Sequence, residues 1–85
     1  MLERNNNILD KIFKFESMIN DNESVFLDLD EVEDIILYYL NEDNFDYAEK
    51  AIRYGIDLYP ESLNIIILKS EFLLTTNKKI GRAHV

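Results

Sequence analysis

The densest group of ionisable side chains is the run DLDEVED, with Asp28, Asp30, Glu31, Glu33 and Asp34 inside seven residues. Such a density of carboxylates suggests a calcium loop. An EF-hand loop, however, needs alternating ligands, a central Gly and a bidentate Glu at its end. This run contains no Gly, and the VEDIIL segment already has helical spacing. We therefore interpret the acids as a helix cap and a solvated helix face, and we expect no metal site.

Catalysis by proton transfer or nucleophilic attack needs a base beside a nucleophile, or paired carboxylates in a pocket. The chain has no cysteine, and its one histidine, His84, lies in a C-terminal segment of different composition. The serines therefore have no other histidine as a partner, and no glycine-rich loop is present to hold a phosphate. The tyrosines are not interleaved with basic residues, which favours helix packing over base stacking. We expect no enzymatic activity and no cofactor.

The charge balance restricts the class of partner. Seventeen acidic residues against nine basic ones give a formal net charge of −8. Nucleic acids and anionic membranes both require clustered basic residues, so neither is an expected partner. A basic protein or peptide fits the charge, although acidic residues that simply keep a small domain soluble explain it equally well. The N-terminus does not resemble a signal peptide, and no apolar run approaches the ~20 residues that span a membrane. We expect a cytoplasmic protein.

Helical periodicity dominates the chain and predicts an all-α fold of about four helices. The first stretch carries an apolar stripe between Ile8 and Ile19, and the polar residues 20–24 then interrupt it. The second and third stretches have amphipathic spacing over 28–43 and 44–60. The SVFLDL segment and the run from Ile65 to Leu68 have weak strand character, but there is no hairpin turn to pair them.

Residues that start and stop helices lie at the ends of these stretches. Asp28 or Asp30 is the expected N-cap of the second helix, and Asp43 or Asn44 that of the third. Pro60 ends the third helix or opens the fourth. The fourth helix is apolar around most of its circumference, so it should have neighbours on several sides.

From Asp28 to Pro60 the spacing resembles the tetratricopeptide repeat, a 34-residue helix–turn–helix unit with the pattern W-x₂-L-G-x₂-Y…A-x₃-F…P. The positions that match this pattern or its aromatic and small-residue preferences are Val32, Ile35, Ile36, Tyr39, Phe45, Ala48, Ile52, Gly55 and Pro60. The block from KFESMI through IILYYL is also similar to larger bacterial repeat proteins of this family.

The resemblance implies an α-solenoid organised as a capping helix and linker over 1–27, a helix pair over 28–62 and the first helix of a following repeat over 63–79. Ala48 and Gly55, seven residues apart on one helix face, should let a neighbouring backbone approach closely. The chain also departs from the family. It has no Trp, Ile36 replaces a small residue and should widen the helix crossing, and Lys69 stands where an apolar residue is usual.

In a tetratricopeptide solenoid the first helix of each repeat lines a concave binding face. Carried over, this implies a partner-binding set: Asp30, Glu33, Asp34, Leu37, Asn41, Asn64, Ile67, Leu68, Glu71 and Thr75. The expected ligand is an extended basic or mixed peptide. The alternative is that Leu37, Ile67 and Leu68 merely pack against the N-terminal helix.

The C-terminal segment IGRAHV, residues 80–85, resembles a translated sequencing adapter. Its codons can be written ATC GGA AGA GCA CAC GTC, which matches the third frame of AGATCGGAAGAGCACACGTC. We therefore expect the native sequence to end near Lys78 and the chain to be an N-terminal fragment, and we exclude His84 and Arg82 from any site.

Three functions remain open. The chain is a non-catalytic protein–protein interaction scaffold, a structural capping segment of a larger repeat protein, or a small acidic helical regulator that is complete as written. Solenoid repeats stabilise one another, and at least ~3 are usually needed. We therefore expect the fourth helix, around Ile66 and Leu73, to be partly bare and to self-associate.

Overall fold

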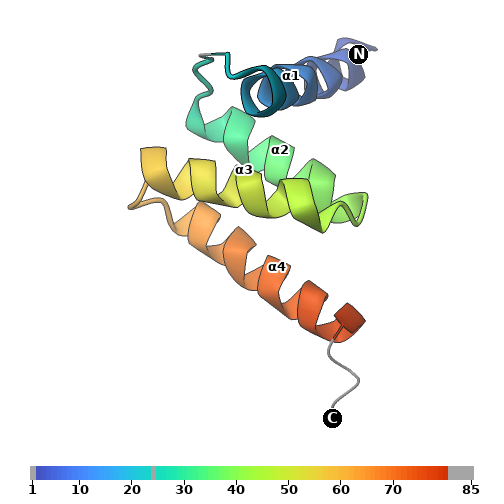
Figure 1. Ribbon diagram of the computed structural model, residues 1–85, viewed down its shortest axis with the longest axis vertical. Coiled ribbons are helices and arrows are strands. Elements are labelled where there is room, and N and C mark those ends of the chain that lie inside the picture. The colour runs from blue at the N-terminus through green and yellow to red at the C-terminus, as the bar shows by residue number, and fades with distance from the viewer. Residues whose placement is uncertain (1, 24, 81–85) are drawn as a thin grey trace.

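The structure is a computed structural model that describes the backbone of residues 2–23 and 25–80 and the side chains of residues 8–23 and 25–77. These residues form four helices, and no strand occurs among them (Figure 1). The helices are α1 (Leu2–Asp21), α2 (Leu29–Asn41), α3 (Phe45–Leu58) and α4 (Leu63–Ile80). The predicted all-α fold is confirmed, and the SVFLDL segment contributes no strand among its described residues.

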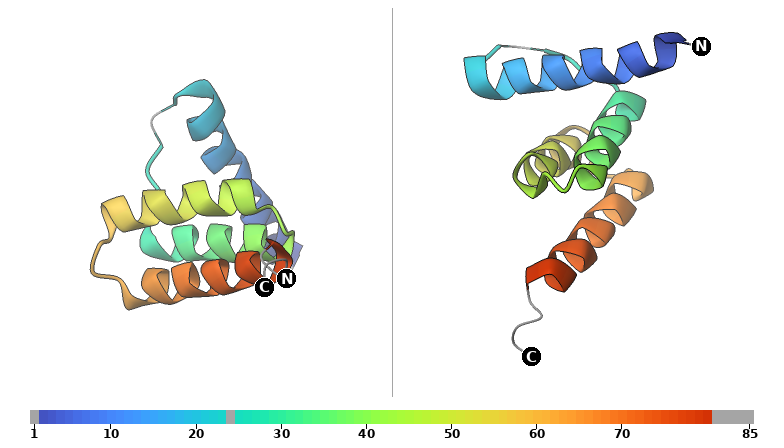
Figure 2. Two further views of the ribbon diagram at one scale, coloured as in Figure 1. Left: turned by 60° about the horizontal axis from the view of Figure 1, so that its bottom comes forward. Right: turned by 90° about the vertical axis from the view of Figure 1, so that its right-hand side faces the viewer.

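α2, α3 and α4 lie side by side and alternate in direction, and α1 crosses them. α3 returns antiparallel to α2, and α4 reverses direction again, so that α2 and α4 run the same way (Figures 1 and 2). α1 lies across this group at a steep angle, as the left view of Figure 2 shows. α2 packs against each of the other three helices, which makes it the centre of the fold.

Both internal helix starts are capped by short polar side chains. The Asp28 carboxylate accepts a hydrogen bond from the Glu31 backbone N–H at 3.0 Å, and the Asp28 N–H donates to the Glu31 carboxylate at 3.0 Å. This reciprocal pair is a capping box. Asn44 caps α3 by accepting from the Tyr47 N–H, while Asp43 takes a turn conformation with φ 59°. Asp28 and Asn44, rather than Asp30 and Asp43, are therefore the caps.

Asp28→Ala is expected to lower the free energy of unfolding by about 1 kcal/mol, because the substitution leaves the Glu31 backbone N–H at the start of α2 without its acceptor. Asp28→Ser keeps an oxygen acceptor and should recover most of that loss. Thermal unfolding followed by circular dichroism measures both. An Asp28→Ser protein as unstable as Asp28→Ala would show that the cap does not hold this helix.

The core is a single cluster of apolar side chains drawn from all four helices and the linker. Its buried members are Ile12, Phe15, Leu27, Val32, Ile35, Ile36, Tyr39, Ala48, Ala51, Ile52, Ile65 and Leu68. Val32, Ile35, Ile36 and Tyr39 come from α2, in agreement with its central place. Leu27 comes from the linker and is fully buried, so this segment belongs to the core although it is not helical.

Gly55 marks the point where three helices meet. A Cβ atom placed on Gly55 would lie 2.9 Å from Val32 Cγ1 and 3.1 Å from Ile65 Cδ1. Val32 belongs to α2 and Ile65 to α4, so side chains of both helices fill the space that glycine leaves on α3. The expectation of a close backbone approach at Gly55 is thus corrected: two side chains approach it. Ala48 and Ile36 are also fully buried.

The expected segment limits differ slightly from the observed ones. α1 begins before Ile8 and ends at Asp21, where Asn22 with φ 61° turns the chain. α4 includes Ile80, the first residue of the expected adapter-derived tail, and residues 81–85 of that tail lie outside the described residues. None of the helices in residues 2–23 and 25–80 has the length and apolar character needed to cross a membrane.

Candidate partner-binding surface

The face of α2 that points away from the core carries the first half of the predicted binding set. Asp30, Asp34, Leu37 and Asn41 are all exposed, because they recur at helical spacing opposite the buried Val32, Ile35, Ile36 and Tyr39. Leu37 is 43% exposed, an apolar side chain set among acidic and amide groups. This face therefore offers a small apolar contact within a polar surround.

α4 brings the second half beside it. Asn64 Nδ2 donates to Glu33 Oε2 at 3.0 Å, which joins the start of α4 to α2. One helical turn beyond this bond lie Leu37 on α2 and Ile67 on α4, since the two helices run the same way. Ile67 is 54% exposed. We call these exposed residues on adjacent helices the candidate surface: Asp30, Leu37, Asn41, Asn64, Ile67 and Glu71.

Leu68 does not belong to this surface. It is 8% exposed and is part of the hydrophobic core, so its assignment as a binding residue was wrong. Thr75 is half-buried. The alternative prediction, that Leu37, Ile67 and Leu68 pack against the N-terminal helix, is wrong for Leu37 and Ile67, because both side chains are exposed, whereas Leu68 does pack in the interior.

Two of the acidic residues assigned to the partner are already engaged within the chain. Lys11 Nζ on α1 donates to Asp34 Oδ2 at 3.0 Å, and Glu33 accepts from Asn64. The neighbouring acids thus point to opposite sides of α2, one toward α1 and the other toward α4. Asp34 is half-exposed in this pair, so its contribution to stability is small, but the pair reduces the negative charge available to a ligand.

Tyrosine hydroxyls form hydrogen bonds that periodicity did not predict. Tyr39 on α2 donates to Glu16 on α1 at 2.8 Å, and Tyr47 on α3 donates to Asn20 on α1 at 3.1 Å. Burial, followed by the hydrogen bond to Glu16, raises the pKa of the Tyr39 hydroxyl above its ordinary value. These bonds attach α1 to the central helices, in addition to the expected packing role of the tyrosine rings.

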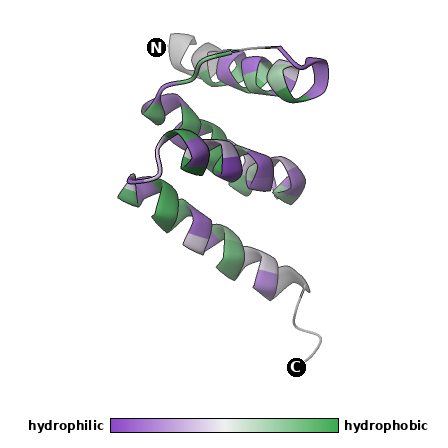
Figure 3. Cartoon of the chain, turned by 60° about the vertical axis from the view of Figure 1, so that its left-hand side comes forward, coloured by the Kyte–Doolittle hydropathy of each residue, from purple (hydrophilic) through white to green (hydrophobic). Residues whose placement is uncertain are grey.

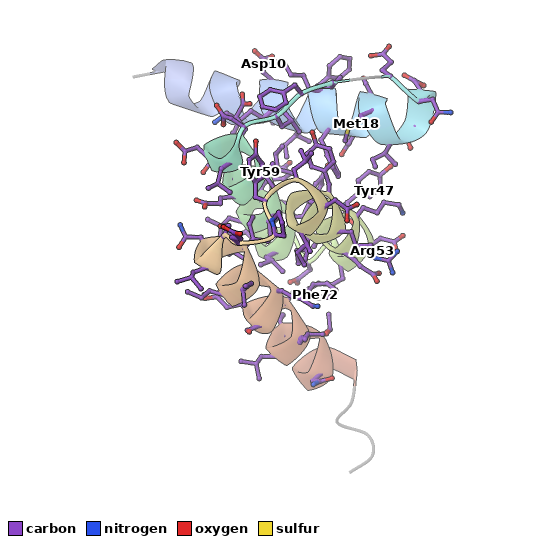
Figure 4. All side chains as sticks on the ribbon, turned by 90° about the vertical axis from the view of Figure 1, so that its left-hand side faces the viewer. Asp10, Met18, Tyr47, Arg53, Tyr59 and Phe72 are labelled. Atoms are coloured by element: carbon purple, nitrogen blue, oxygen red, sulfur yellow. The ribbon has the colours of Figure 1, made fainter. Side chains whose placement is uncertain are left out.

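Two further tyrosines hold the linker between α1 and α2. The Tyr54 hydroxyl donates to the Val25 carbonyl oxygen at 3.2 Å, and the Tyr59 hydroxyl donates to the Leu27 carbonyl oxygen at 2.9 Å. Figure 4 shows Tyr59 beside the linker and Tyr47 beneath α1. We call Tyr54 and Tyr59 the linker clamp. Both come from the third helix or the residue that follows it.

A shallow cavity of about 220 Å³ lies on the other side of α4, against α3. Its lining residues are Glu49, Ile52, Arg53, Ile56, Lys69, Phe72 and Leu73. Arg53 is paired with Glu49 at 3.2 Å within the helix. Lys69, which departs from the tetratricopeptide pattern, is exposed at the rim of this cavity, and a charged residue therefore costs little there.

The chain was compared with protein-family models, with curated proteins and with solved structures. None of these matches it. Within residues 2–23 and 25–80, no group of three or more His, Cys, Asp or Glu side chains is placed to hold a metal ion. The surface on α2 and α4 is accordingly defined by its own geometry: exposed Leu37 and Ile67, bordered by carboxylate and amide groups.

Proposed function

We propose that the chain is part of a non-catalytic protein-binding scaffold built from tetratricopeptide-like helix pairs. The observation that carries the proposal is the exposure of Leu37 on α2 and Ile67 on α4, each one helical turn beyond the Glu33–Asn64 hydrogen bond that joins the two helices, with Asp30 and Glu71 exposed on the same helices. Apolar side chains that are buried in the core are already shielded from water. Exposed apolar side chains on packed helices, with acidic residues nearby, are typical of a protein-binding surface.

The packing of the helices supports the repeat assignment. α3 packs antiparallel to α2 and carries small, buried Ala48 and Gly55, and α4 packs on both helices. A repeat solenoid requires this arrangement, because each new helix must cover the preceding pair. At Gly55, side chains of both neighbouring helices, Val32 of α2 and Ile65 of α4, fill the space that the glycine leaves.

The expected ligand is an extended peptide that combines basic and apolar side chains. Its apolar residues would contact Leu37 and Ile67, while its Lys or Arg side chains would lie near Asp30 and Glu71. Because these acids are exposed, they should accelerate association and orient the peptide more than they add affinity. Binding should therefore weaken as salt is added.

Leu37→Lys is expected to weaken binding of such a peptide by about tenfold or more, equivalent to ~1.4 kcal/mol. The matched control is Leu58→Lys, because Leu58 has the same 43% exposure but lies at the end of α3. Fluorescence anisotropy with a panel of labelled basic–apolar peptides, read at low and high salt, measures both variants.

Equal loss in the two variants would place binding elsewhere, and a panel that yields no ligand would count against the scaffold. A structural segment that only stiffens a larger protein has the same helices but binds no peptide, so the same experiment separates the two functions.

A further inference from the structure

The linker between α1 and α2 presents the most exposed large apolar side chain among the described residues. Phe26 is 74% exposed, although its neighbour Leu27 is fully buried. Phe26 is not a member of the core cluster. Figure 3 shows this hydrophobic part of the linker between the hydrophilic end of α1 and the hydrophilic start of α2. An aromatic ring is thus held in water at a position where the fold itself does not use it.

The linker clamp fixes the residues on both sides of this ring. Tyr54 bonds to the Val25 carbonyl oxygen, and Tyr59 bonds to the Leu27 carbonyl oxygen. The buried side chain of Leu27 anchors the same segment in the core. Because its neighbours are held, the backbone of Phe26 is ordered before any ligand arrives. A ligand that contacts Phe26 therefore loses little affinity to the ordering of this segment.

An open cavity of about 520 Å³ lies beside Phe26, between the end of α1, the linker and the end of α3. Its lining residues are Met18, Glu23, Val25, Phe26, Tyr54 and Leu58. We call this cavity the linker groove. Leu58 is 43% exposed and also lines a second cavity, of about 400 Å³, at the turn between α3 and α4. The linker groove therefore offers an apolar floor that continues past Leu58.

The charge of the linker groove is negative. Glu23 is the one charged residue among those that line it, and none of them is basic. Asp57 is exposed on the turn of α3 that carries Leu58. α1 and α3 both end at this groove, and neither has a basic residue in its last turn. The partial negative charges of both helix ends are therefore not compensated there, and the groove favours a cation.

This charge selects against a second copy of the chain as the occupant. Two linker grooves that met about a two-fold axis would bring Glu23 near its own copy and would place acidic helix ends together. The net charge of −8 adds a repulsion between whole chains. Nucleic acids and anionic membranes are disfavoured for the same reason. A suitable ligand must bring positive charge together with apolar surface.

We propose that the linker groove binds a segment of another protein in which a Lys or Arg side chain is flanked by apolar side chains. The apolar side chains pack against Phe26 and Leu58. The cation lies near the Glu23 carboxylate and the ring of Phe26, both of which attract positive charge. The proposal does not depend on the proposed function, because the linker groove shares no residue with the candidate surface on α2 and α4.

The probe is a panel of short fluorescein-labelled peptides in which one Arg is flanked by Leu and Phe. Each peptide has a matched version with neutral citrulline in place of Arg. Fluorescence anisotropy measures their dissociation constants for the 85-residue chain. Phe26→Ala should weaken binding by about tenfold or more, as expected for an aromatic residue at the centre of an interface. Glu23→Gln and the change from Arg to citrulline should each weaken it by about threefold.

The matched control is Phe13→Ala, which should leave the affinity unchanged. Phe13 has the same side chain and is 72% exposed, but it lies on α1 and does not line the linker groove. Amide shifts in ¹⁵N NMR spectra locate the bound peptide: those of Val25 and Phe26 should move, whereas those of Leu37 and Ile67 should not. Thermal unfolding checks that each variant is folded.

Four results would overturn the proposal. A panel without binding and equal losses for Phe26→Ala and Phe13→Ala are the first two. The third is a citrulline peptide that binds as tightly as its Arg version, because the groove would then accept apolar surface without a cation. The fourth is self-association of the chain alone, seen by sedimentation equilibrium and removed by Phe26→Ala, which would identify a second copy as the occupant.

The same series keeps this proposal separate from the proposed function. Binding at the linker groove should be lost in Leu58→Lys and kept in Leu37→Lys, which is the reverse of the pattern expected for the candidate surface. A peptide that is released only by Leu37→Lys would support the candidate surface and contradict the linker groove.

Discussion

Ile65→Ala is expected to lower the free energy of unfolding by about 2–5 kcal/mol, the usual cost of truncating a buried isoleucine. Ile65 is fully buried and fills the space beside Gly55, where α3 and α4 meet. The substitution leaves a cavity at the junction of three helices, which a glycine on the opposite side cannot fill. In a domain of this size, such a loss is a large part of the total stability.

The neighbouring isoleucine provides a matched control. Ile67 has the same side chain two positions along the helix but is 54% exposed. Ile67→Ala should therefore change the stability of the monomer by no more than about 0.5 kcal/mol. Urea denaturation of the two variants at the same low protein concentration compares them. Similar losses for both substitutions would mean that α4 does not present this face to the core.

Leu27→Ala is expected to have an effect of similar size, about 2–5 kcal/mol, although Leu27 lies in a segment without regular secondary structure. Its side chain is fully buried, and its carbonyl accepts a hydrogen bond from Tyr59. Truncation would open a cavity beneath the linker and weaken the attachment of α1 to the rest of the fold.

Phe26→Ala serves as the control for the linker. Phe26 is the larger residue but is 74% exposed, so its truncation should be close to neutral. Urea denaturation measures both variants. A Phe26→Ala protein destabilised as much as Leu27→Ala would show that the linker lies on the core in another orientation.

The helices could be predicted because their apolar spacing is regular. The stripe through Ile12 and Phe15 in α1 and the buried positions of α2 follow the 3.6-residue period, and both are buried. Capping was predictable to within two candidates, since Asp and Asn are preferred at N-caps and their neighbours are acidic as well. The hydrogen bonds in the structure identify Asp28 and Asn44 as the N-caps.

The orientation of α4 could not be predicted in the same way. The run Ile65–Leu68 is apolar at every position, so periodicity does not show which residues face inward. The repeat resemblance places Ile67 and Leu68 alike in the binding set, and only the structure separates them: Leu68 is buried and Ile67 is exposed. The burial of Leu27 could not be predicted either, because one leucine in a short non-helical linker shows no hydrophobic periodicity.

The partners of the acidic residues also depended on tertiary structure. The sequence places Glu33 and Asp34 next to each other in a helix, and adjacent helical residues point in different directions. That Asp34 meets Lys11 and Glu33 meets Asn64 follows only from how α1 and α4 lie on α2. Charge composition therefore overstated how much of the acidic face is free for a ligand.

The linker clamp has a consequence for how the molecule opens. Tyr54 and Tyr59 hold backbone carbonyls that lie 29 and 32 residues earlier in the chain. The linker and α1 therefore cannot detach without breaking contacts to α3, and these parts form one cooperative unit. Among the described residues, no hydrogen bond joins α4 to the linker in this way, and several apolar side chains of its outer face are exposed. The molecule should consequently lose its order from α4 first, with the clamped part persisting as the slower, more protected unit.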